Sequence, residues 1–207
     1  MSEIETVGKE KISILSKKTR LTLQIVGAAI FSSLSLIFSL FVVPYLPRTP
    51  EGIAYFDPVS IIWVTCFLIF GPLAGILCCV IGMILLFPFD PFTPIGPLMK
   101  FSATFSLIII PILLLYLIKK QEGERMSQKL KKLKTYIIYG ALGTIVRIIV
   151  MVILNIVVYL ALGLNPAGLG YYIVIVILLN ALTSLWDLLI PYLLVFTTKL
   201  DEKFEIW

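Results

Sequence analysis

Long apolar segments separated by short polar or Pro/Gly-rich stretches most constrain what this chain can fold into. Six such segments follow one another, at residues 21–43, 57–70, 73–89, 98–118, 136–162 and 171–198. A helix needs about 20 mostly apolar residues to cross a hydrocarbon core of about 30 Å. Because 59% of the residues are apolar and 14% are charged, against roughly half and a quarter in soluble domains, little remains for a soluble domain. We therefore predict an all-α membrane protein with six transmembrane helices.

The basic residues predict its orientation. Fourteen of the 17 Lys and Arg residues lie in the N-terminal segment, in the stretch 119–134 or near the C-terminus, and Arg48 alone lies in a loop on the opposite side. Positively charged loops stay on the cytoplasmic side, so both termini should be cytoplasmic. An amphipathic surface helix or a calmodulin target remains an alternative for the basic loop. The predicted organisation is a cytoplasmic segment (1–20), a six-helix transmembrane domain (21–200) and a cytoplasmic tail (201–207).

Two ionisable residues lie inside predicted helices, Arg147 in the fifth and Asp187 in the sixth. A charge in hydrocarbon costs on the order of 2.5 to 3.5 kcal/mol on insertion scales, so each needs a partner or a water-filled cavity. If these helices form a hairpin with its bend near Ala167, both residues lie 20 positions from the bend. We predict an ion pair, as a structural clamp rather than a proton relay. Asn155 and Asn180 then lie level with each other, about two turns closer to the outer surface.

Further polar groups should converge on the same outer half. Asp57 opens the second helix, Asp90 ends the third and Lys100 lies just inside the fourth, while Thr183 lies one turn inward of Asn180. The two outer loops carry the aromatic residues Tyr45, Tyr55, Phe56, Phe89 and Phe92. These aromatics are typical of an anchoring belt, but a polar cluster beneath them could also hold a small planar solute. We predict a cup that opens outward and binds a ligand through Asp57, Lys100, Asn155, Asn180 and Thr183.

Small residues follow a four-residue spacing on the first helix. The pairs are Ala28 with Ser32 and Ala29 with Ser33, and such spacing lets another helix approach closely. Packing within the bundle and docking of a partner subunit are both consistent with this pattern.

The sequence lacks the residues and motifs that several classes of function require. The chain has no histidine, and its three cysteines lie in apolar runs without metal-ligand spacing, as is typical of buried small hydrophobes. We find no Walker P-loop, H-E-x-x-H, G-x-S-x-G or paired-acid motif. We therefore expect no enzymatic activity, metal or cofactor. The net charge of +5 follows from the positive-inside pattern and does not indicate nucleic-acid binding. Six helices are also few for a self-sufficient secondary transporter, so another component should supply the energy.

The sequence resembles a known family, the substrate-binding S components of energy-coupling-factor (ECF) vitamin transporters, and within it the riboflavin-type branch. The resemblance covers about residues 21–200. It is carried by Phe56-Asp57, by Phe70-Gly71-Pro72-Leu73-Ala74-Gly75 at a short turn, by Gly96-Pro97-Leu98-Met99-Lys100-Phe101, by Met151 to Asn155 and by Asn180, which occur in the order that this branch shows. The Phe70–Gly75 turn is the most specific of these motifs.

The resemblance implies a function and partners. It implies riboflavin as the transported ligand, bound near the outer face of a multi-pass protein of a prokaryotic cell membrane. The partners would be a transmembrane coupling subunit, contacted by Ala28, Ala29, Ser32 and Ser33, and two cytoplasmic ATPase subunits, besides membrane lipid.

The chain also departs from the branch. Pro58 directly follows Asp57 where the branch usually has a second Asp before a Pro, Lys100 replaces an Asn, and Thr183 replaces a Lys. Another vitamin or a precursor therefore stays an alternative ligand. A membrane scaffold or assembly protein without a small ligand, or a membrane enzyme with an unfamiliar motif, is the alternative from another class.

Overall fold

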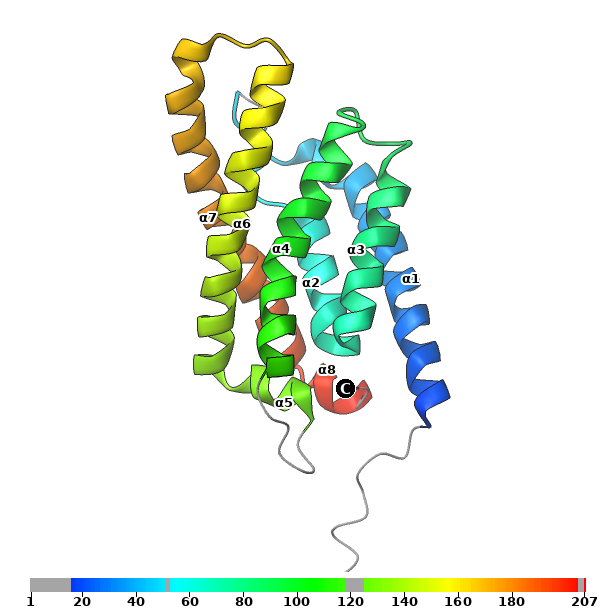
Figure 1. Ribbon diagram of the computed structural model, residues 1–207. Helices are drawn as coiled ribbons and strands as arrows, with labels where there is room; N and C mark the ends of the chain where they lie inside the picture. Colours follow the sequence, from blue (N-terminus) through cyan, green and yellow to red (C-terminus); the bar gives the residue numbers. More distant parts are fainter. Residues whose placement is uncertain (1–15, 51–52, 118–124, 205–206) are drawn as a thin grey trace, which may run out of the picture.

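The computed structural model describes residues 16–50, 53–117, 125–204 and 207, and these residues form a helical bundle (Figure 1). Its elements are α1 (Lys17–Phe41), η1 (Val43–Tyr45), α2 (Pro58–Phe70), α3 (Pro72–Leu86), α4 (Ile95–Leu117), α5 (Met126–Lys131), α6 (Leu133–Ala161), η2 (Pro166–Gly168), α7 (Leu169–Tyr192), η3 (Leu193–Thr197) and α8 (Leu200–Phe204). The prediction of an all-helical protein is confirmed. Parts of three predicted cytoplasmic segments, residues 1–15, 119–124 and 205–206, lie outside the described residues.

Among the residues that the structure describes, four helical segments are long and apolar enough to cross a membrane, namely Lys17–Tyr45, Ile95–Leu117, Leu133–Ala161 and Pro166–Thr197. The chain is therefore a multi-pass membrane protein. The other two apolar helices are shorter, with 13 residues in α2 and 15 in α3. At 1.5 Å per residue they extend about 20 and 22 Å, less than the thickness of the hydrocarbon core. The count of six transmembrane helices stays a prediction.

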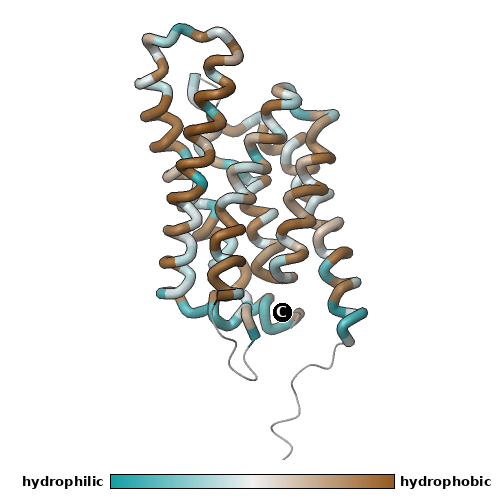
Figure 2. The backbone as a smooth tube through the Cα atoms, viewed as in Figure 1, coloured by the Kyte–Doolittle hydropathy of each residue, from teal (hydrophilic) through white to brown (hydrophobic). Residues whose placement is uncertain are grey.

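Helix α6 shows how the sequence sorts its two faces. Ile145, Ile149, Ile153 and Val157 recur every four residues and are exposed, as expected for side chains that face lipid. The opposite face carries Gly143, Arg147, Met151, Asn155 and Tyr159, which are also four residues apart and buried. This buried face packs against α4 and α7. Figure 2 shows that hydrophobic residues dominate most of the helix lengths, whereas hydrophilic residues gather at the end that holds α5, α8 and the start of α1.

Helix α2 forms the centre of the bundle. All of its 13 residues are buried, as expected for a helix that is hydrophobic on every side, and it packs against α1, α3 and α7. Its Trp63 donates a hydrogen bond to Ser35 Oγ on α1 at 2.9 Å. Gly82 of α3 permits this arrangement, because a Cβ there would lie 2.6 Å from the Trp63 ring.

The C-terminal residue closes one end of the bundle. Trp207 donates from Nε1 to the carbonyl oxygen of Leu68 at 3.1 Å, and its own carbonyl oxygen accepts from Ser127 on α5. Its ring covers Gly71 at the turn between α2 and α3, where φ is +99° and a Cβ would lie 2.8 Å from the indole. The Phe70–Gly75 turn therefore has a packing role at this end.

Candidate functional site

A cavity of about 590 Å³ opens at the end of the bundle opposite α5 and α8. Its walls come from α4, α6 and α7 and from the loops that precede α2 and α4. Helix α2 begins only at Pro58, so the loop before it covers the space above its first turn. In this loop Arg48 and Ala54 form an isolated antiparallel bridge, and both residues line the cavity. The volume lies in the range of about 300 to 1,000 Å³ that small-molecule sites occupy.

The cavity wall is mostly apolar, with aromatic rings from two helices and two loops. Tyr159 and Tyr172 pack with ring centroids 5.0 Å apart between α6 and α7, and Phe56 and Phe92 come from the two loops. Met99, Met151, Ala103 and Leu179 add aliphatic surface. A wall of this kind suits a flat, partly apolar ligand.

All five residues predicted to bind a ligand line this cavity: Asp57, Lys100, Asn155, Asn180 and Thr183. The structure thus brings together side chains from four different segments of the chain. Their contact with a ligand stays a prediction.

Asp57 lies at the mouth side of α2 and caps this helix. Its Oδ1 accepts from the backbone N–H of Val59 at 3.1 Å, and its Oδ2 accepts from Ser60 Oγ at 3.4 Å. A carboxylate at a helix N-terminus satisfies otherwise unpaired N–H groups and complements the helix dipole. Ser60 and Thr104 of α4 also share a hydrogen bond of 2.7 Å, which ties α2 to α4 below the cavity.

The two asparagines do not bond to each other but are each fixed by a neighbour. Asn155 accepts a hydrogen bond of 2.7 Å from the Tyr172 hydroxyl, and Asn180 accepts one of 3.3 Å from Arg147 Nε. Each amide nitrogen donates to the carbonyl oxygen four residues earlier, on Met151 and Val176. Because an amide nitrogen carries two hydrogens, each asparagine keeps one donor for a ligand.

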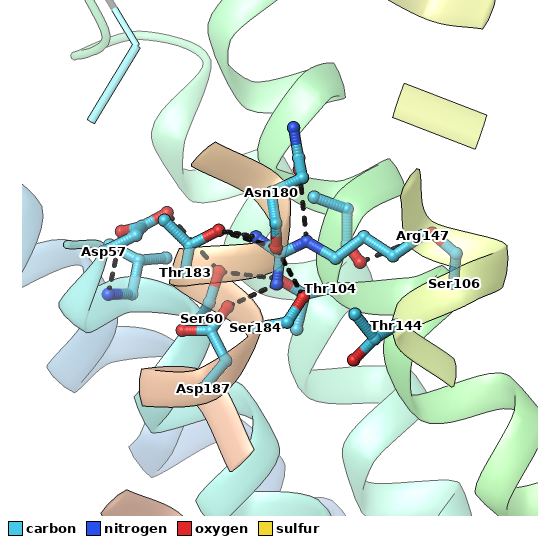
Figure 3. Close-up of polar contacts among 12 residues, drawn as sticks. Asp57, Ser60, Thr104, Ser106, Thr144, Arg147, Asn180, Thr183, Ser184 and Asp187 are labelled. Atoms are coloured by element: carbon cyan, nitrogen blue, oxygen red, sulfur yellow. Dashed lines mark hydrogen bonds and ion pairs between the residues drawn. The ribbon is translucent and has the colours of Figure 1, made fainter. Parts of the chain in front are cut away.

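Arg147 and Asp187 lie together in the interior (Figure 3). Arg147 Nη1 lies 2.5 Å from Asp187 Oδ2, and the side chains are 5% and 0% exposed. Arg147 Nη2 also donates to Thr183 Oγ1 at 3.0 Å. The structure therefore shows a buried ion pair that joins α6 to α7, with Arg147 itself in the cavity wall.

Lys100 has a partner at the rim. Its Nζ lies 3.4 Å from Asp90 Oδ2 in the loop between α3 and α4, and Asp90 Oδ1 accepts from the backbone N–H of Phe92. Gly96 lets Asp90 approach, since a Cβ there would lie 2.4 Å from Oδ1. The pair therefore fixes both the lysine and the aromatic loop beside the cavity.

Two cavity residues that hold the asparagines, Tyr172 and Arg147, have no predicted role in ligand binding. Tyr172 lies in the sixth predicted helix and has no predicted function there, yet its hydroxyl orients Asn155. Arg147 was assigned to the clamp alone, although it also lines the cavity. Tyr172 lies five residues after Ala167 and Asn155 lies 12 before it, so counting from the bend gives no signal for this contact.

The prediction for the small residues of α1 needs a correction. Ala28 and Ser32 are 0% exposed, and Ser32 donates a hydrogen bond of 3.1 Å to the Cys78 carbonyl oxygen of α3. These two residues pack inside the bundle, so the prediction that all four face a partner is wrong for them. Ala29 and Ser33, each one residue further along and about 100° around the helix, are exposed.

Within the described ranges, no group of three or more Cys, Asp or Glu side chains could hold a metal ion. The three cysteines are buried and free.

Comparisons with known proteins bear on the fold. No family model and no curated protein matches this sequence. A solved structure of the S component of a bacterial ECF transporter is similar, with a TM-score of 0.61 and 23% sequence identity. The similarity covers 88% of this chain and 98% of that one. The chain has the fold of that S component.

Proposed function

We propose that the chain is the substrate-binding membrane subunit of an ECF-type vitamin uptake transporter and that riboflavin is its ligand. The observation that carries the proposal is the cavity, which combines aromatic walls with amide and charged groups in a fold shared with an S component. The sequence motifs that resemble the riboflavin branch add to this support. In this proposal the protein resides in a prokaryotic cell membrane with six spans and both termini in the cytoplasm.

The position of the cavity fits uptake from outside. The basic residues concentrate at the end of the bundle that holds α5, α8 and the start of α1. The cavity lies at the opposite end. If that basic end is cytoplasmic, the cavity opens outward. A transmembrane coupling subunit and two cytoplasmic ATPases would then drive release of the ligand to the inside.

Titration of the purified protein with riboflavin tests the ligand. We expect flavin fluorescence to fall as the ring leaves water for the aromatic wall. Asn155→Ala and Asn180→Ala should each weaken binding by between about 5-fold and 100-fold, since each removes a buried hydrogen-bonding group. Asn165→Ala is the matched control, because Asn165 lies in the exposed loop between α6 and α7 and its side chain accepts a hydrogen bond only from the nearby backbone N–H of Ala167 among the described residues. Absence of quenching at micromolar riboflavin would reject this ligand, and equal affinity in all variants would reject the site.

The exposed side of α1 is the proposed contact with the coupling subunit. Ala29→Leu should leave riboflavin binding by the isolated subunit unchanged but reduce recovery of the complex and riboflavin uptake, because close helix approach depends on small side chains. Ala28→Leu is the contrasting variant, since it overfills the interior of the bundle and should lower thermal stability of the isolated subunit. Normal complex recovery and uptake with Ala29→Leu would contradict this contact.

A further inference from the structure

Arg147 combines a buried position with access to the cavity. The residue is 4% exposed and belongs to the cavity wall, beside Asn180 and Thr183. Three partners fix its guanidinium: Nε donates to Asn180, Nη1 to Asp187 and Nη2 to Thr183. A side chain held at three points cannot swing away from the cavity, so its donors point in constant directions (Figure 3).

The guanidinium has more donors than these partners use. Arginine carries five N–H groups and no acceptor. In the described part of the chain three of the five have acceptors, which leaves one on Nη1 and one on Nη2. Asn180 contributes a further amide N–H at the same place, since Val176 accepts only one of its two. The inner end of the cavity is therefore rich in donors.

The charge at this end is already balanced. Asp187 is fully buried outside the cavity wall, 2.5 Å from Arg147, so the pair has no net charge for a ligand anion to neutralise. A fixed donor with a neutralised charge suits an uncharged acceptor such as a carbonyl oxygen, which accepts hydrogen bonds and donates none.

The rim of the cavity also offers acceptors. Asp90 lies there, in the loop between α3 and α4 beside Lys100, and carboxylate oxygens accept hydrogen bonds from hydroxyls. A ligand with ring carbonyls at one end and a hydroxyl-bearing chain at the other fits this arrangement with its carbonyls inward, against the donors of Arg147 and Asn180. Riboflavin has that constitution.

We infer that Arg147 is a ligand-contacting specificity residue, whose remaining N–H groups donate to a ring carbonyl oxygen of the bound flavin while Asp187 neutralises and orients it. The inference rests on the proposed function and extends it. It assigns to one side chain both the α6–α7 ion pair and recognition of the ligand.

The test uses the double variant Arg147→Met/Asp187→Leu, which removes both charges together so that neither is left unpaired. Thermal unfolding measures whether it folds, and calorimetry measures riboflavin binding. We expect affinity to fall by between about 10-fold and 100-fold, as for loss of a hydrogen bond from a charged donor. Thr144→Val is the control, because Thr144 lies on α6 next to Arg147 but bonds within its own helix to Gly140.

A second measurement separates contact from support. The flavins with sulfur in place of one ring carbonyl oxygen, 2-thioriboflavin and 4-thioriboflavin, are weaker acceptors at that position. One of them should bind the wild-type protein more weakly than riboflavin does, and this difference should disappear in the double variant. Comparing two ligands in two proteins isolates the interaction between Arg147 and the ring carbonyl, because the steric cost of sulfur is common to both proteins.

The outcomes are distinguishable. Riboflavin binding by the wild-type protein with unchanged affinity in the double variant, or an equal thioflavin penalty in both proteins, would overturn the role of Arg147 and leave the proposed function standing. No riboflavin binding by the wild-type protein would overturn both. If the double variant fails to fold, Arg147→Met/Asp187→Asn, which also removes both charges and the proposed donor, replaces it in the thioflavin comparison, where the same unchanged penalty would overturn the inference.

Discussion

Asp187→Ala is expected to lower the free energy of unfolding by about 3 to 5 kcal/mol, because it leaves the Arg147 guanidinium unpaired in the interior. Arg147→Met should have a similar effect, since it leaves the Asp187 carboxylate without its cation. Both side chains are almost inaccessible, and Asp187 lies outside the cavity wall, so its carboxylate cannot reach solvent by a change of rotamer. Unfolding of the detergent-solubilised protein, followed by circular dichroism against increasing denaturing detergent, measures both losses.

The double variant Arg147→Met/Asp187→Leu should recover much of this stability. Replacing a buried ion pair by apolar residues of similar size is often neutral or stabilising, whereas breaking it is not. Asp57→Asn is a suitable control, because Asp57 is only half-buried and its amide replacement can still cap α2. A double variant no more stable than the worse single variant would show that the two charges do not compensate each other.

The ion pair also shows what the sequence could predict. Arg147 and Asp187 were placed at one depth because both lie 20 residues from Ala167, and a helical hairpin converts equal counts into equal depth. The structure places them 2.5 Å apart. The polar and Pro/Gly-rich stretches between the apolar runs predicted the long helices to within a few residues at each end, because a helix that crosses hydrocarbon must be mostly apolar along its length.

Side-chain contacts between neighbouring helices were harder to predict from the sequence. The counting placed Asn155 and Asn180 level, but it could not reveal that Tyr172 and Arg147 hold their carbonyl oxygens. Such contacts depend on the rotation of each helix and on side-chain reach, which the count along the chain does not contain. The burial of Ala28 and Ser32 was missed for the same reason: a small-residue spacing specifies close approach, but not which neighbouring helix approaches.

Gly143→Ala, which adds a single methyl group, is expected to destabilise the protein by about 1 to 3 kcal/mol through overpacking. A Cβ at this position would lie 2.5 Å from the Leu107 carbonyl oxygen of α4. This oxygen belongs to a helix backbone, so α4 and α6 must separate to accommodate it. Because Gly143 lies one turn from Arg147 on the same buried face, the separation should also weaken riboflavin binding.

Gly140→Ala is the matched control for Gly143→Ala, one turn away on α6. A Cβ there would meet the end of the Leu188 side chain, with Cδ1 at 2.8 Å, and this side chain can rotate away. Alanine also favours the helix over glycine by up to about 1 kcal/mol, so Gly140→Ala should be neutral or slightly stabilising. Denaturant unfolding and riboflavin titration of both variants measure the contrast. Equal stability of the two would mean that α4 and α6 are not held together at Gly143 by close backbone contact.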